Sequence, residues 1–257
     1  MENDELDSEE FEDFEDEELT RDLVVPGEIL TEDVENFLPG RGTILNDKKD
    51  KIISLNIGLK KITKNYINVI PLRGFYTPRP GDKVTALVVD KNPVKYKCDI
   101  NAKDYAILKP KNTFKRSRIK IRGAEQPVGD TSTEKYSIGD ILITKIISAD
   151  RLNMPELTTV GKYLGKRSNG IVISIDPPKI PRVIGRSGSM IKLLKNLTKC
   201  HIFVTQNGRI WLKGEDLAHE KLLINAIKKI EMEAHTVGLT DRMSEYIENE
   251  KKKRGIK

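Results

Sequence analysis

The residues best suited to binding a charged ligand lie in the stretch PRVIGRSGSMIKLLKN, from Pro181 to Asn196. Glycines lack a Cβ atom, so backbone amides beside them can come within hydrogen-bond range of a phosphate. An arginine adds a permanent charge with five donors, and the start of the following helix favours an anion. The pattern predicts a contact with a nucleic-acid backbone; the alternative is a plain turn between two helices. The predicted contact residues are Gly185, Arg186, Ser187, Gly188, Ser189 and Lys192.

The elements around this loop must hold it at the surface, and their order is informative. Residues 170–176 predict a strand, 181–184 a short helical turn and 189–197 an amphipathic helix. Asn207-Gly208 predicts a two-residue hairpin turn, and the apolar spacing over 215–236 predicts a long helix. This order, β-α-α-β-β-α, is that of a type I KH domain.

In a KH domain the loop between the first two helices contacts the backbone of about four nucleotides. Ile184, Met190 and Ile191 would then offer apolar surface on which bases could rest. The alternative keeps the KH fold and leaves the loop empty. Placement of the glycines between two helices favours RNA binding.

A second basic stretch lies upstream, in KPKNTFKRSRIKIRG (109–123), which has seven basic residues and no acidic one. Arg116, Arg118, Lys120 and Arg122 alternate with other residues, which would align their charges on one face of a strand. We expect these four residues to bind RNA, the alternative being a charged loop that is simply well solvated. Aromatic residues that could stack on bases are scarce here, and the candidates are Tyr96, Tyr105 and Phe114.

The basic stretch is framed by segments with the alternation of β-strands, at 79–90, 95–101, 105–110 and 137–150. Four or five short strands in about 70 residues fit a small closed barrel of the oligonucleotide-binding (OB) type. Before them, alternating apolar residues and glycine turns predict a small all-β module, too short to form a large core alone. The predicted fold is therefore multidomain and mainly β, with a small N-terminal β domain, an OB-type barrel and a C-terminal α+β type I KH domain.

Charge is distributed very unevenly along the chain. Residues 1–22 contain 13 acidic residues and one arginine, a net charge of −12, so the remaining 235 residues carry +18. A body this basic favours a polyanionic partner, whereas a block of like charge is expected to stay disordered. The acidic segment is either a solubilising leader or a flexible competitor that covers the basic surface when RNA is absent.

Other classes of protein fit the sequence poorly. The three histidines and the widely separated Cys98 and Cys200 do not form a metal-binding pattern, so neither a metal nor another cofactor is expected. Carboxylates such as Asp82, Asp99, Asp104 and Asp140 could serve a nuclease, but no Asp-x-Glu pair or other catalytic motif stands out, and no catalytic residue is expected. No apolar run approaches the length of a membrane span and no secretory signal is present. We therefore expect a cytoplasmic protein that is not an enzyme and has no membrane partner.

Several motifs together resemble one family over residues 23–236: VPGEIL, LPGRGTIL, the P-x-GD opening, DINAKDYAIL, IPRVIGRSGSMI and QNGRIWLKG. The chain resembles the RNA-binding cap subunit of the archaeal exosome. The resemblance implies a noncatalytic subunit, present in three copies or mixed with a related cap subunit. These copies would sit on a hexameric ring of phosphorolytic exoribonuclease subunits and feed the 3′ end of single-stranded RNA into it. A different reading of the same domains is a stand-alone RNA-binding regulator or a ribosome-associated factor.

The resemblance also implies how the chain is divided. It predicts an N-terminal β domain at 23–77 that docks on the ring, the barrel at 78–152 and the KH domain at 153–237. The acidic tail covers 1–22, and residues 238–257 are expected to form a basic, mobile C-terminus. Two motifs depart from the family: KYKCDIN replaces an aromatic-rich strand, and the hairpin turn reads TQNG rather than GQNG. We expect that turn to have a structural role, packing the KH domain against the barrel.

Overall fold

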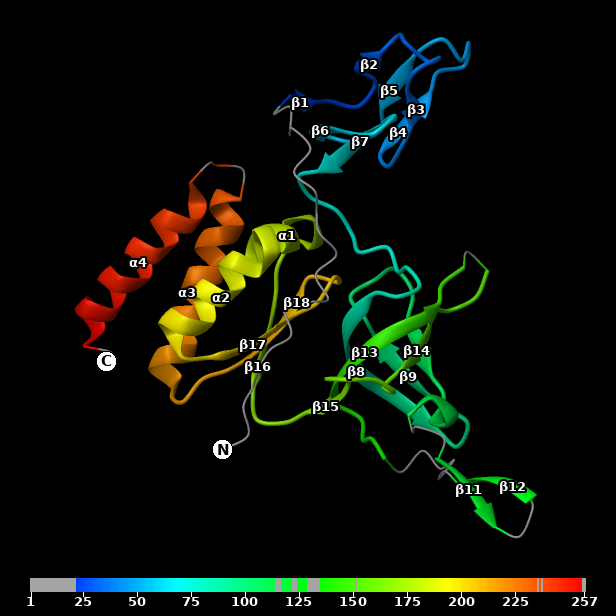
Figure 1. Ribbon diagram of the computed structural model, residues 1–257, viewed down its shortest axis with the longest axis vertical. Helices are drawn as coiled ribbons and strands as arrows, with labels where there is room; N and C mark the ends of the chain where they lie inside the picture. Colours follow the sequence, from blue (N-terminus) through cyan, green and yellow to red (C-terminus); the bar gives the residue numbers. More distant parts are fainter. Residues whose placement is uncertain are drawn as a thin grey trace. The chain divides into compact units, whose positions relative to one another are not determined.

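The computed structural model describes residues 22–113, 117–121, 124–128, 135–150, 152–234, 236 and 238–255 (Figure 1). The chain divides into two compact units, Met1–Gly74 with Ile184–Met190 and Phe75–Val183 with Ile191–Lys257. The acidic segment 1–22, apart from Asp22, lies outside the described residues.

The N-terminal module consists of short strands in two small sheets. One sheet has the order β1-β6-β7-β3 and the other the order β2-β5-β4. Their bounds are β1 Leu23–Val24, β2 Ile29–Thr31, β3 Leu38–Pro39, β4 Thr43–Leu45, β5 Ile52–Ser54, β6 Gly58–Thr63 and β7 Tyr66–Pro71. The core is small and apolar because each strand turns alternate residues inward. Its buried members are Val24, Leu30, Ile52, Ile67 and Val69.

A closed barrel follows, as predicted. The strands run in the order β14-β10-β9-β8-β13, and an additional pairing of β14 with β13 closes the sheet, while β15 extends it from β13. Closure leaves no free edge among the five barrel strands. The bounds are β8 Lys83–Asn92, β9 Lys95–Asp99, β10 Ala106–Leu108, β13 Ile141–Ser148, β14 Glu156–Thr158 and β15 Gly165–Arg167.

Between β10 and β13 the chain forms a 3₁₀ turn, η2 (Pro110–Asn112), and a separate two-stranded hairpin. Its strands are β11 (Ser117–Ile121) and β12 (Ala124–Val128), paired antiparallel. This hairpin carries part of the basic stretch and is the lowest green element in Figure 1.

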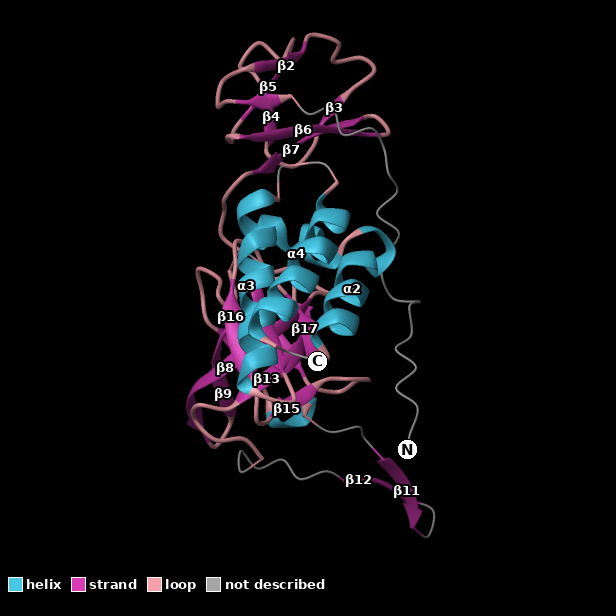
Figure 2. Cartoon of the chain, turned by 90° about the vertical axis from the view of Figure 1, so that its left-hand side faces the viewer, coloured by secondary structure: helices cyan, strands magenta, loops and turns pink. Residues whose placement is uncertain are grey.

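The last third of the chain has the predicted KH order. A three-stranded sheet, β16-β18-β17, is covered on one face by helices (Figures 1 and 2). Ile202, Ile210 and Leu212 are buried in this sheet, and the buried side of α3 includes Leu222, Ile227 and Ile230. The bounds are β16 Ile171–Ser174, η3 Pro177–Lys179, α1 Ile180–Ile184, η4 Arg186–Gly188, α2 Ser189–Thr198, β17 His201–Val204, β18 Arg209–Lys213 and α3 Leu217–Glu233.

The expectation of a mobile C-terminus is wrong for most of that segment, because Leu239–Arg254 forms helix α4, which packs on α3. Leu239, Met243 and Ile247 recur at four-residue spacing and are all buried, so they form one apolar stripe along the helix. The surrounding charged residues hid this stripe in the sequence. Gly255 ends α4 in the left-handed conformation, and its amide donates to the carbonyls of Lys251 and Lys252.

Both cysteines are buried free thiols, Cys98 in β9 and Cys200 just before β17. Burial, with a smaller effect of the Asp99 charge, raises the pKa of the Cys98 thiol to about 12. Burial also raises the pKa of Cys200. Across the part of the chain that the structure describes, no helix combines the length and the apolarity needed to cross a membrane.

Candidate nucleic-acid interface

The glycine loop between α1 and α2 has an unusual backbone. Gly185, Ser187 and Gly188 all have positive φ angles, of 73°, 46° and 73°. A Cβ atom at Gly185 would lie 2.7 Å from both the Cβ and the backbone nitrogen of Met190, which is closer than such contacts can be. Glycine is therefore required at 185 by the packing of the loop itself, whatever the loop binds.

The side chains of the loop face solvent. Arg186, Ser187 and Ser189 are exposed, and so is Lys192, one turn further along α2. The loop amides, however, are partly used within the loop, since Gly188 N–H donates to the Gly185 carbonyl at 3.2 Å and Ser189 N–H donates to the Arg186 carbonyl. These two amides are therefore engaged within the loop, and contact of the six loop residues with RNA stays a prediction.

The apolar residues that were expected to support bases lie elsewhere. Met190 and Ile191 are only 2% and 7% exposed, so they belong to the interior and not to a binding surface. They face inward because the apolar stripe of α2 continues through Leu194, which is fully buried. Ile184 is half-buried and is the member of the set with surface to offer.

The predicted basic strand exists in part. Arg118 and Lys120 occupy alternate positions of β11, opposite Pro127 and Glu125 of β12. Arg116 and Arg122 lie outside the described residues, as does Phe114. The role of these four basic residues in RNA binding stays a prediction.

The barrel has one aromatic surface that the sequence only partly indicated. Tyr105, just before β10, is 45% exposed, and Lys97 of β9 places its Nζ atom 4.2 Å from the centre of the Tyr105 ring. Tyr96, by contrast, is fully buried and cannot stack on a base. The alternation of KYKCD gives the reason: Tyr96 and Cys98 share the inward face, and Lys97 points outward. Lys97 was missed because its approach to Tyr105 depends on the pairing of β9 with β10, in which Lys97 lies opposite Ile107.

A partly buried carboxylate, that of Glu156, fixes the start of the basic insertion. Lys109 Nζ lies 2.8 Å from Glu156 Oε2, and the Asn112 side-chain amide donates to Glu156 Oε1 at 2.7 Å. The hydrogen bond from Lys109 is the main cause that lowers the pKa of Glu156, against the effect of burial. Lys109 is therefore engaged in positioning η2.

The Asn207-Gly208 turn joins the KH region to the barrel, and its predicted structural role is confirmed. The Asn207 side chain is fully buried and donates to the carbonyls of Thr85 at 2.9 Å and Ile100 at 2.8 Å. Its oxygen accepts the Thr85 N–H at 3.3 Å. Glycine is required at 208, where φ is +82° and a Cβ atom would lie 2.4 Å from the Ile175 carbonyl.

An ion pair reinforces this junction. Arg209 Nη2 lies 2.6 Å from Asp99 Oδ2, and Nη1 donates to the Asp99 carbonyl at 2.7 Å. Burial alone would raise the pKa of Asp99, but the Arg209 hydrogen bond, the Asn101 amide and the Arg209 charge together lower it. Asp99 is therefore held ionised at the junction.

Three of the carboxylates considered for a nuclease have structural partners. Asp82 accepts a hydrogen bond from Tyr76, Asp99 pairs with Arg209, and Asp140 lies 2.7 Å from Lys166. Among the described residues, no three His, Cys, Asp or Glu side chains are grouped so that they could hold a metal ion.

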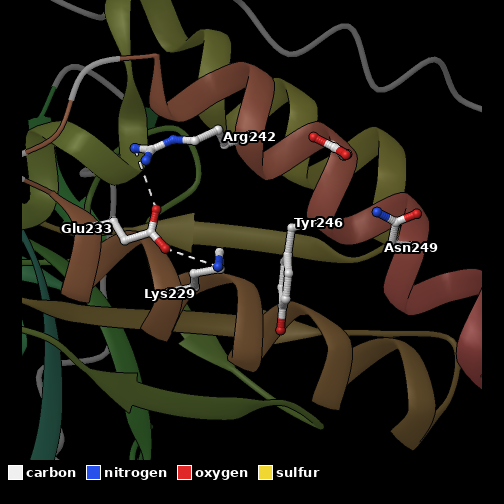
Figure 3. Close-up of a pocket in the computed structure, with 6 residues that line it drawn as sticks. Lys229, Glu233, Arg242, Tyr246 and Asn249 are labelled. Atoms are coloured by element: carbon white, nitrogen blue, oxygen red, sulfur yellow. Dashed lines mark ion pairs between the residues drawn. The ribbon is translucent and has the colours of Figure 1, made fainter.

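A hollow of about 280 Å³ lies between α3 and α4 (Figure 3). Its walls are charged: Glu233 lies 3.0 Å from Lys229 and 3.5 Å from Arg242, and Lys229 stands over the Tyr246 ring. These contacts hold α4 on α3 and complete the packing of the KH region.

Comparison with known proteins adds a family to this geometry. A family model described as a KH domain matches residues 170–218. The exosome complex component Rrp4 of Methanothermus fervidus is 40% identical over 230 residues, covering 88% of this chain and 95% of the relative. Rrp4 of Saccharolobus solfataricus is 41% identical and covers 89% of this chain and 88% of the relative.

A solved structure agrees with these relatives. A crystal structure provisionally described as an exosome complex RNA-binding protein superimposes with a TM-score of 0.60 at 35% identity. It covers 70% of this chain and 99% of the solved chain. The chain therefore belongs to the Rrp4 family of exosome complex components.

Proposed function

We propose that this chain is a noncatalytic RNA-binding subunit of an exosome, working in the cytoplasm. It captures single-stranded RNA and feeds the 3′ end into a hexameric ring of phosphorolytic 3′–5′ exoribonuclease subunits. The main support is the 40% identity to an exosome component over 88% of the chain. The matched region includes all three modules. A KH loop or a barrel alone would support only RNA binding.

The modules divide this work. Residues 23–77 dock on the ring, the barrel at 78–152 contacts RNA, and the KH domain at 153–237 contacts RNA through its glycine loop. Three copies, or copies mixed with a related cap subunit, stand on one ring. The candidate RNA contacts in the KH loop are Gly185, Arg186, Ser187, Gly188, Ser189 and Lys192.

In the barrel and its insertion the candidates are Arg116, Arg118, Lys120 and Arg122. The pair of half-buried Lys97 and exposed Tyr105 is added from the structure, because a cation beside a half-exposed ring can hold a phosphate and a stacked base together. RNA bound in this way is kept near the ring, which turns a second encounter into an intramolecular one.

Deletion of residues 23–75 tests this division. The fragment should still bind RNA, because none of the candidate RNA contacts lies in that segment. It should not stimulate the ring, since an undocked fragment only competes for substrate and slows decay. The assay follows decay of a tailed single-stranded RNA by the ring with full-length protein, fragment or neither. Equal stimulation by both would reject the docking role of 23–77, and no stimulation by the full-length chain would favour a stand-alone regulator.

A further inference from the structure

The segment that joins β14 to β15 presents a tyrosine and a lysine to solvent. Tyr163 is 45% exposed, and Lys162 places its Nζ atom 5.1 Å from the centre of the Tyr163 ring. From 157 to 175 the chain has three basic residues and no acidic one. An exposed ring beside a cation repeats the chemistry of Tyr105 and Lys97, on a segment outside both the glycine loop and the basic insertion.

Tyr163 has a backbone conformation that tyrosine rarely adopts. Its φ angle is 64°, in the left-handed region, which glycine and asparagine tolerate best. A bulky residue persists in this region only where the surrounding contacts hold it there, and such positions concentrate at functional sites. The conformation therefore points to a use for the exposed ring of Tyr163.

Arg167 holds the segment from β15. Its Nη2 atom donates to the Tyr163 carbonyl at 2.8 Å. Its Cζ atom lies 5.4 Å from the ring centre of Phe203 and 5.5 Å from that of Trp211, two residues that lie opposite each other in β17 and β18. Because β15 pairs with β13, Arg167 ties the segment to the barrel sheet and to the KH sheet at once.

The charges beside Tyr163 favour an anionic ligand. Burial lowers the pKa of Arg167, but a guanidinium stays protonated in proteins. Within the part of the chain that the structure describes, Arg167 Nε is buried without a hydrogen-bond partner. Lys166, the third basic residue of the stretch, is paired with Asp140 at 2.7 Å. Lys162 and Arg167 therefore supply the positive potential around the Tyr163 ring.

A single-stranded nucleic acid offers both groups that this arrangement can bind. The flat face of a base can stack on the Tyr163 ring, and the adjoining phosphate can be held by Lys162 Nζ. A protein partner would have to cover two cations at the centre of its contact, where charged residues are usually depleted. The chemistry of the site therefore favours RNA.

We propose that Tyr163 and Lys162 form a further contact for single-stranded RNA at the junction of the barrel and the KH region. Tyr163 stacks on one base, and Lys162 binds the phosphate beside it. The inference rests on the proposed function and adds to it a binding site. Because every base has a π-face, the contact accepts any base.

The experiment measures binding of the full-length chain to a fluorescent single-stranded RNA over a range of salt concentrations. Tyr163→Asn removes the ring and keeps a residue that tolerates a positive φ angle, whereas Tyr163→Phe keeps the ring. Lys162→Ala removes the cation. The control is Tyr66→Ala, which removes a tyrosine that is 49% exposed from the N-terminal module.

We expect Tyr163→Asn to bind RNA at least about fivefold more weakly, as for the loss of one stacked base, with an unchanged salt dependence. Lys162→Ala should instead make the slope of log affinity against log salt shallower by about 0.7, the value for one phosphate on a single strand. Tyr163→Phe and Tyr66→Ala should bind like the unmodified chain. All four variants should keep the melting temperature, and RNA substituted with thiouridine should photocrosslink to the peptide that contains Tyr163.

Other results would overturn the contact. Unchanged affinity of Tyr163→Asn, or no crosslink to its peptide, would reject this site while RNA binding by the chain stands. Weaker binding together with a lower melting temperature would make Tyr163 a structural residue. Equal losses in Tyr163→Phe and Tyr163→Asn would assign the role to the hydroxyl and contradict stacking. Failure of the unmodified chain to bind RNA would reject the proposed function, and the contact with it.

Discussion

At the residue scale, the glycine loop combines a backbone that requires glycine at position 185 with side chains that are exposed to solvent. Gly185 is fixed by its closeness to Met190, whereas the side chains of Arg186 and Ser187 are exposed to solvent. Substitutions in these two exposed side chains test binding, with the melting temperature as the check on the fold.

We expect Arg186→Asp with Ser187→Asp to weaken RNA binding by about tenfold or more, because a hydrogen bond to a charged group contributes about 1.5 to 3 kcal/mol and two carboxylates would repel phosphate. Binding of a fluorescent single-stranded RNA and the melting temperature are the measurements. Lys221→Asp, exposed on α3, is the charge control. Unchanged affinity in the loop variant would leave RNA binding to the barrel alone.

Asp99 gives a prediction on pH. Burial alone would raise the pKa of Asp99 in the folded state, but the hydrogen bond from Arg209 lowers it overall. Ionised Asp99 therefore stabilises the fold fully above its unfolded pKa of about 3.9. This stabilisation is lost as the pH falls through the lower pKa of the folded state. Asp99→Asn should therefore lower the free energy of unfolding at pH 7. The difference in the free energy of unfolding between the variant and the unmodified chain should shrink below about pH 4. Urea unfolding of both proteins from pH 3 to 7 measures this difference. A difference that stays constant down to pH 3 would contradict a stabilising ion pair.

At the element scale, the order of the strands and helices was predicted well, whereas contacts between individual side chains were not. The Asn207-Gly208 pair predicted the hairpin, and the apolar spacing over residues 215–236 predicted helix α3, because both signals are local. Tyr96 was misjudged as a stacking residue although the alternation of KYKCD already placed it beside Cys98, on the inside. The hydrogen bonds of Asn207 to Thr85 join residues far apart in the chain, so no local pattern could reveal them.

Helix α4 was missed for a different reason: charged residues around its apolar stripe obscured the helical spacing in the sequence. The buried Met243 should matter to stability: Met243→Ala is expected to cost about 2 to 5 kcal/mol, as in other well-packed interiors. Glu248→Ala, exposed on the same helix, is the control and should cost little. Denaturant unfolding measures both, and equal, small effects would mean that the C-terminus is not docked in solution.

At the scale of the whole molecule, the charge of the chain governs how it meets RNA. If about five phosphates are neutralised, the logarithm of the affinity should fall with the logarithm of salt at a slope near −3 to −4, from about −0.7 per contact on single strands. Replacing Arg116, Arg118, Lys120 and Arg122 by alanine should flatten that slope for every RNA sequence. A loss confined to one sequence would mean that these residues read bases.

The hydrogen bonds of Asn207 also affect how the molecule unfolds. The barrel carbonyls of Thr85 and Ile100 accept hydrogen bonds from a side chain of the KH region. If either part unfolded alone, buried polar groups of the other part would lose their hydrogen-bond partners. Barrel and KH region should therefore melt as one cooperative unit. Cys98 and Cys200 are natural reporters, one in each part, because a thiol reagent reaches them only when their own region opens. Both should become reactive at the same denaturant concentration in the unmodified chain, and Asn207→Ala should separate the two midpoints.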